Sequence, residues 1–139
     1  MRVLGLDVGD RRIGVAVSDS LGITAQRLTV VERGETLSRD VDAVATLAAS
    51  HGAEAVVVGL PLTMRGEIGE QAKKVMAFVE ALRQRVACPV ETVDERLTTV
   101  QGQRALLETD ASRAKRKQRI DQVAAQLILQ SYLDVRAHR

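Results

Sequence analysis

Three acidic residues that lie far apart in the sequence could act together: Asp7, Glu95 and Asp121. Asp7 closes a buried apolar run, Glu95 follows the last expected strand, and Asp121 lies on the last expected helix. Burying a lone charge is costly unless it is paired or binds a cation. Carboxylates brought together repel one another, and a hard divalent ion such as Mg²⁺ or Mn²⁺ relieves that repulsion because it prefers oxygen ligands. The set therefore predicts a metal site for phosphodiester chemistry, in which two ions can activate water and stabilise the leaving oxygen.

Each of these acids also has a structural interpretation. Asp7 could cap the turn that follows it, and Asp121 could form an ordinary ion pair with the lysine one helical turn earlier. Asp94 is an alternative to Glu95, and so is a polar network between Glu95 and Arg96. We prefer Glu95 because its longer side chain can reach over the strand ends, whereas the shorter Asp94 is better suited to holding the turn.

The elements that must position these residues alternate along the chain. Continuous apolar runs at 3–6 and 13–17 suit the two arms of a hairpin that is buried on both faces. Further strands are expected at 23–31, 55–59 and 89–93, and helices at 36–50 (capped by Thr36), at 67–86, from about 98, and at 120–135, with a loose segment at 108–114. The alternation indicates an α/β protein with a mixed sheet and helices on its faces.

The position of the acids in this order suggests that they meet. Ligands of open α/β sheets bind beyond the carboxyl ends of the strands. If the first and last strands run parallel, Asp7 and Glu95 emerge at the same edge of the sheet. The apolar stripe expected on the last helix consists of Ile120, Val123, Ala124, Leu127 and Ile128. Asp121 lies one step off this stripe, which puts it at the edge of the core.

A cluster of cations precedes Asp121, with five of them in seven residues: Arg113, Lys115, Arg116, Lys117 and Arg119. Such a run can be a solvated helix face, but beside a carboxylate site it is better placed to hold phosphates. The whole chain is only mildly basic, with a net charge of +2. Its two aromatic residues are too few for a single-strand binder that works by base stacking.

Length and composition limit the remaining possibilities. Residues 1–139 are expected to form one domain. The single cysteine, Cys88, allows no intramolecular disulfide and, with no Cys/His set, no zinc site. We interpret Cys88 as a small buried apolar residue. We see no signal peptide and no apolar run long enough to cross a membrane, so a cytoplasmic protein is expected.

Four motifs, in this order, resemble the YqgF/RuvX family of bacterial nucleases: DVGDRRIGVAVSD, VVVGLPLTMRGEIG, DERLTT and RKQRIDQVAAQLILQSYL. Members of that family are described as Holliday junction resolvases and as the pre-16S rRNA nuclease. The resemblance covers nearly the whole chain. It implies a ribonuclease H-like fold, with five strands in the order 3-2-1-4-5 and the second strand antiparallel.

The resemblance also assigns residues. The family's acids fall on Asp7, Glu95 and Asp121. In the wider ribonuclease H superfamily the second acid usually follows the fourth strand, whereas here that strand ends in Gly59-Leu60-Pro61 and Glu95 takes its place. The expected nucleic-acid contacts, from the motifs and from the cation cluster, are Arg12, Arg65, Arg96, Thr98, Arg113, Lys115, Arg116, Lys117 and Arg119.

The function expected from all of this is that of a metal-dependent endonuclease acting on structured RNA or branched DNA, as a monomer or a homodimer. One alternative is a noncatalytic RNA-binding adaptor that uses the cation cluster alone. Another is an ATP-binding domain of the actin type, which also opens with Asp-x-Gly in a hairpin. That architecture places the nucleotide between two domains and needs a second glycine-rich phosphate loop, which this sequence lacks.

Overall fold

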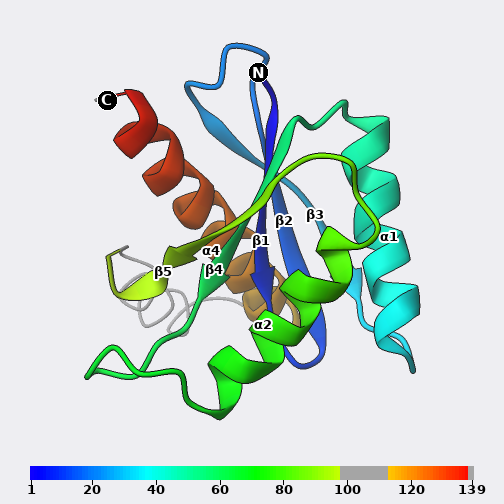
Figure 1. Ribbon diagram of the computed structural model, residues 1–139, viewed down its shortest axis with the longest axis vertical. Coiled ribbons are helices and arrows are strands. Elements are labelled where there is room, and N and C mark those ends of the chain that lie inside the picture. Colours follow the sequence, from blue (N-terminus) through cyan, green and yellow to red (C-terminus); the bar gives the residue numbers. More distant parts are fainter. Residues whose placement is uncertain (98–112, 138–139) are drawn as a thin grey trace.

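A computed structural model describes residues 1–97 and 113–137, including all of their side chains except those of 113–119. Within these residues, five strands form one mixed sheet in the order β3-β2-β1-β4-β5 (Figure 1). The strands are β1 (Val3–Val8), β2 (Arg12–Ser18), β3 (Ala25–Glu32), β4 (Ala55–Leu60) and β5 (Val90–Asp94). Strand β2 is antiparallel to β1, while β4 runs parallel to both β1 and β5. The strand order and directions implied by the family resemblance are confirmed.

Helices cover both faces of this sheet (Figure 1). They are α1 (Leu37–Ser50), α2 (Glu70–Arg83) and α4 (Arg113–Ala137), with a short 3₁₀ turn, η1 (Glu95–Leu97), directly after β5. One core lies under α1 and α2 and includes Leu4, Leu6 and Phe78. The other core lies under α4 and includes Val3, Val57 and Leu129. The alternating side chains of β1 therefore divide between the two cores, as the pleat of a strand requires.

The first two helices begin in different ways, α1 at a side-chain cap and α2 after a closed turn. The hydroxyl of Thr36 accepts a hydrogen bond from the backbone N–H of Arg39, as the predicted N-cap should. Helix α2 is shorter than expected and begins at Glu70 rather than 67. The reason is a closed turn before it: Thr63 accepts hydrogen bonds from Gly66 and Glu67, and Gly66 takes a positive φ of 81°.

The last helix differs from expectation in its start and in its buried face. Helix α4 begins at Arg113, so the prediction of a loose segment is wrong for 113–114. The residues of α4 that are buried are Ala124, Ala125, Ile128, Leu129 and Leu133. Val123 and Leu127, predicted for the stripe, are only partly buried. The stripe is rotated because α4 lies very close to the sheet: a Cβ atom at Gly5 would be 2.6 Å from the Cβ of Leu129. The helix expected from about 98 lies outside the described residues.

Within the described part of the chain, no helix has the length and apolar character needed to cross a membrane.

Candidate active site

Asp7 lies inside β1 rather than at its end, one residue before Val8. Its neighbours Leu6 and Val8 belong to the core under α1 and α2, so Asp7 faces α4. Its partner on β2 is Gly14. On β4, Val58 pairs with Leu6, which puts the following residue, Gly59, at the level of Asp7. A carboxylate that is only 5% exposed is thus flanked on both sides by glycines.

Gly14 determines where Asp121 lies. A Cβ atom at this position would be 2.0 Å from the backbone oxygen of Asp121, so only glycine allows α4 to approach β2 this closely. The side chain of Asp121 is 19% exposed, and its Oδ2 accepts a hydrogen bond from Nε of Arg12 at 2.9 Å. Asp121 therefore lies over the hairpin, beside the strand that carries Asp7. The resemblance predicted Arg12 as a nucleic-acid contact, and the structure gives its guanidinium a carboxylate partner.

Gly59 leaves space for the side chain of Glu95, which is the first residue of η1. The Oε1 atom of Glu95 is 2.8 Å from the place of a Cβ at Gly59, and Glu95 is 5% exposed. The turn that carries Glu95 is held by Asp94, whose Oδ1 accepts from the backbone N–H of Arg96 at 2.9 Å. The Arg96 guanidinium pairs with the same carboxylate at 2.7 Å. Hydrogen bonding from the Arg96 side chain is the main reason that the pKa of Asp94 lies below its usual value.

The three acids line one cavity of about 330 Å³, at the carboxyl ends of the parallel strands. The other residues around it are Val8, Gly9, Asp10, Gly59, Pro61 and Gln71. The polar side chains of this set are carboxylates and one amide, and among the described residues no histidine or cysteine lines the cavity, so it suits Mg²⁺ or Mn²⁺ rather than zinc. Among the described residues, no three Asp, Glu, His or Cys side chains are already grouped as a metal ion would need them. Binding of an ion would therefore require the side chains to turn toward one another.

The other predicted nucleic-acid contacts are less fully described. Arg65 is exposed on the loop between β4 and α2. Arg96 lies against that loop, because its guanidinium is 3.1 Å from the place of a Cβ at Gly66. Thr98 lies outside the described residues, as do the side chains of Arg113, Lys115, Arg116, Lys117 and Arg119. The backbone of the last five forms the first turns of α4, directly before Asp121.

Gln71 and Asp10 were missed by sequence reasoning, and so were the roles of the two glycines. A glycine in the interior of a predicted strand is a signal of close approach by another segment. Gly14 and Gly59 carried that signal, but nothing in the sequence says which segment approaches. Gln71, in the first turn of α2, and Asp10, in the hairpin turn, carried no comparable signal.

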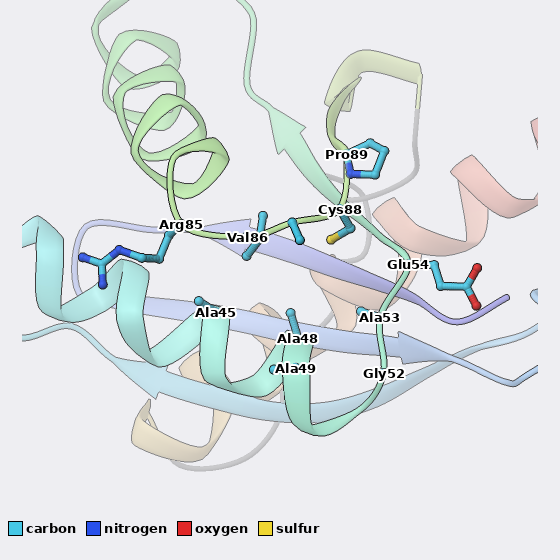
Figure 2. Close-up of a pocket in the computed structure, with 11 residues that line it drawn as sticks. Ala45, Ala48, Ala49, Gly52, Ala53, Glu54, Arg85, Val86, Cys88 and Pro89 are labelled. Carbon is cyan, nitrogen blue, oxygen red and sulfur yellow. The ribbon is translucent and has the colours of Figure 1, made fainter.

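A larger cavity, of about 640 Å³, lies at the opposite end of the sheet, between the end of α1 and the segment before β5 (Figure 2). Small residues such as Ala45, Ala48 and Gly52 form much of its wall. Cys88 lies at its edge, and burial raises the pKa of this thiol, which makes it a poorer nucleophile. None of Asp7, Glu95 and Asp121 lines this larger cavity.

The sheet and its helices define a ribonuclease H-like fold. Among solved structures, "T. thermophilus RuvC in complex with Holliday junction substrate" matches with a TM-score of 0.63 and 21% identity, covering 99% of this chain and 96% of that chain. A second structure, "Thermus thermophilus RuvC structure", matches with a TM-score of 0.59 and 18% identity, covering 99% of this chain and 97% of that one. At these identities the likeness concerns the fold.

The family follows from the sequence matches. The family model described as "RuvX: Holliday junction resolvase" matches residues 1–135. A relative from Moorella thermoacetica is 54% identical over 134 residues, 96% of this chain and 95% of its own length. Another, from Myxococcus xanthus, is 52% identical over 139 residues, 100% of this chain and 90% of its own length. Both are named "Putative pre-16S rRNA nuclease". This chain belongs to the RuvX family.

Proposed function

We propose that this protein is a metal-dependent nuclease that hydrolyses phosphodiester bonds in structured nucleic acid. The observation that supports it best is the convergence of Asp7, Glu95 and Asp121 on one cavity from β1, η1 and α4. Asp7 and Glu95 are almost fully buried, and the glycines beside Asp7 allow the backbone of Asp121 and the side chain of Glu95 to approach the sheet closely. Burying a carboxylate is costly unless it is paired or binds a cation, and a divalent ion would offset the negative charge of these acids.

The three carboxylates would hold Mg²⁺ or Mn²⁺. A divalent ion held there would supply Lewis-acid chemistry, by lowering the pKa of a water and offsetting charge on the leaving oxygen. The residues of the chain provide the geometry. The backbone of Asp7 is held within the sheet, that of Glu95 by the turn that Asp94 closes, and that of Asp121 by the contact of α4 with Gly14. The side chains remain able to turn toward a bound ion. Hydrolysis would leave a 5′-phosphate and a 3′-hydroxyl.

For the substrate we propose the 5′ region of the pre-16S rRNA, a four-way DNA junction, or both. The first is supported by the names of the relatives and the second by the description of the family model. The nucleic-acid contacts would come from Arg12, Arg65, Arg96 and Thr98, with the cations that open α4: Arg113, Lys115, Arg116, Lys117 and Arg119. We propose that the protein acts in the cytoplasm. It would act as a monomer or, for symmetric cutting of a four-way junction, as a two-fold dimer.

The experiment that tests this function incubates the purified protein with rRNA precursor and with a synthetic four-way junction, each in Mg²⁺, Mn²⁺ or EDTA, and maps the cut ends. We expect cuts with 5′-phosphate ends in the metal samples alone. Asp7→Asn should bind the same substrates without cutting them. Binding by the wild type with no cleavage in either metal would instead favour a noncatalytic RNA-binding adaptor.

A further inference from the structure

Arg12 and Asp121 form an ion pair within the candidate site, although 109 residues separate them. The Nε atom of Arg12 is 2.9 Å from Oδ2 of Asp121, and the two side chains are 20% and 19% exposed. The pair joins the first residue of β2 to α4. Because Asp121 is the acid that the helix contributes to the site, the partner of its carboxylate bears on whether a metal ion can bind.

A guanidinium and a divalent ion compete for the same carboxylate. An ion held by Asp7, Glu95 and Asp121 needs oxygen atoms of all three, and one oxygen of Asp121 already accepts a hydrogen bond from Arg12. A cation beside the metal site also repels the ion directly, more strongly in a partly buried site than in water. Arg12 in its observed position therefore weakens metal binding.

Nucleic acid offers Arg12 another partner. A guanidinium binds a phosphate as well as a carboxylate, through the same fork of N–H groups. The backbone around Arg12 is held in place, since its carbonyl accepts from Gly9 N–H at 2.9 Å and the Gly9 carbonyl accepts from Arg33 at 3.0 Å. A change of partner by Arg12 thus requires only rotation of its side chain.

We propose that Arg12 exchanges Asp121 for a phosphate when nucleic acid binds, and that this exchange releases Asp121 to the metal ion. The inference rests on the proposed nuclease function. Arg12 is then a positioning residue that couples the two binding events. By linkage, nucleic acid strengthens metal binding by the same factor by which metal strengthens nucleic-acid binding. The protein alone would hold metal weakly and complete its site only on a substrate.

The first test measures Mn²⁺ binding to the free protein by calorimetry. Arg12→Gln removes the competing cation, so it should bind Mn²⁺ about 5- to 20-fold more tightly than the wild type, within the usual range of coupling between sites. Arg11→Gln is the matched control, because it removes the same charge from the same turn at an exposed position. Its affinity should change by less than about 2-fold, since exposed charges are largely screened. Equal effects in the two variants, or weaker binding in Arg12→Gln, would overturn the inference.

The second test measures the coupling itself. Fluorescence anisotropy of a labelled four-way junction gives the affinity of the protein for the junction in Ca²⁺ and in EDTA, and a gel confirms that the DNA stays uncut. The ratio of the two affinities is the factor by which the ion strengthens junction binding. We expect this factor to fall in Arg12→Gln and to be kept in Arg11→Gln. If neither the wild type nor Arg12→Gln binds Mn²⁺, and Ca²⁺ does not strengthen junction binding by the wild type, the proposed function and the inference fail together. If it binds metal and junction but Arg12→Gln keeps the full factor, the inference alone fails.

Circular dichroism melts check that the variants fold. Should Arg12→Gln not fold, Arg12→Lys replaces it in both tests. Lysine keeps the charge but donates as a single point rather than a fork, so it should hold Asp121 less well. Its Mn²⁺ affinity is expected to exceed that of the wild type, and an affinity no higher than that of the wild type would overturn the exchange.

Discussion

The carboxylate of Glu95 lies in the space that a side chain at Gly59 would occupy, with Oε1 only 2.8 Å from the place of a Cβ atom. The Cδ1 atom of Ile128 is closer still, at 2.4 Å. Gly59→Ala should therefore push both side chains away. We expect the free energy of unfolding to fall by about 1–3 kcal/mol, as overpacking usually costs, and metal-dependent cleavage to fall at least about tenfold.

A second substitution separates these two effects. Ile128→Val removes the Cδ1 atom and so makes room for the new methyl group on the apolar side. The double variant Gly59→Ala/Ile128→Val should regain stability in urea denaturation but stay poorly active, because Glu95 is still displaced. Wild-type cleavage by Gly59→Ala would show that the position of Glu95 over Gly59 does not matter to the reaction.

Much of the fold could be predicted because the apolar runs are continuous. The runs at 3–6, 13–17 and 55–59 each become a central strand of the sheet, with ends displaced by one or two residues. Sequence patterns also placed Thr36 as a helix cap and Asp94 as the residue that holds its turn, and the structure confirms both. These features depend on local hydrogen bonds and local periodicity.

The geometry of the site could not be predicted in the same way, because it depends on close approach between distant segments. The contact of Asp121 with Gly14 and the ion pair with Arg12 each join β2 to α4. The rotated stripe of α4 has the same origin, since Leu129 and Ala125 of this helix pack closely against Gly5 of β1. Local periodicity gives the elements but not the distance at which two of them pack.

Asp7→Asn is predicted to separate stability from activity. The amide keeps the shape of the side chain but removes one of three neighbouring negative charges. Cleavage should be lost while junction binding is kept, and in EDTA the melting temperature should hold or rise, because the repulsion among the carboxylates is reduced. The melting temperature distinguishes a catalytic role of Asp7 from a structural one. A clear fall in the melting temperature would mean that Asp7 is structural, and wild-type turnover would mean that it is not catalytic.

Glu95 and Asp94 are neighbours with different expected roles, so their amide variants should differ. Glu95→Gln removes a metal-binding charge and should be nearly inactive, with a loss of several kcal/mol of transition-state stabilisation, each ~1.4 kcal/mol being tenfold in rate. Asp94→Asn weakens the ion pair with Arg96 but leaves the charge of the cavity unchanged, and it should keep substantial activity. Titration of excess Mn²⁺ into Glu95→Gln tests whether metal occupancy can be rescued. The reverse order of activities would move the site to Asp94.

Asp40 makes the stability of the folded state depend on pH. It is 1% exposed, and its carboxylate accepts from Gly34 N–H at 2.8 Å and from Arg33 at 2.9 Å. Burial acts to raise its pKa, but these hydrogen bonds outweigh burial and hold the pKa below its usual value. A lowered pKa stabilises the folded state above the unfolded pKa of about 3.9, and that contribution is lost as the pH falls through the folded pKa.

Asp40→Asn should therefore be less stable than the wild type by about 1–3 kcal/mol at pH 7, because Arg33 loses its charged partner. Urea denaturation at pH 7, 5, 4 and 3 should show this difference shrinking only below about pH 4. Asp42→Asn is the control on the same helix. Its carboxylate is half-exposed and pairs with Arg85, so its effect should stay within about 0.5 kcal/mol. A difference between wild type and Asp40→Asn that does not change with pH would contradict this role.

The cations that open α4 are predicted to contact phosphates. Their helix leads directly into Asp121, so a nucleic acid held over the cavity would pass along its first turns. Each phosphate contact that is lost should flatten the log–log dependence of binding on salt by roughly 0.7–0.9. Replacing Arg113, Lys115 and Arg116 together with Gln should therefore reduce the slope by roughly 2–3 if all three bind phosphates. Replacement of three exposed arginines at the end of the sheet away from the cavity, Arg2, Arg27 and Arg136, by Gln removes the same charge and serves as the control; it should leave the slope nearly unchanged. A slope that is also unchanged in the α4 variant would put these cations on a solvated helix face, away from the path of the substrate.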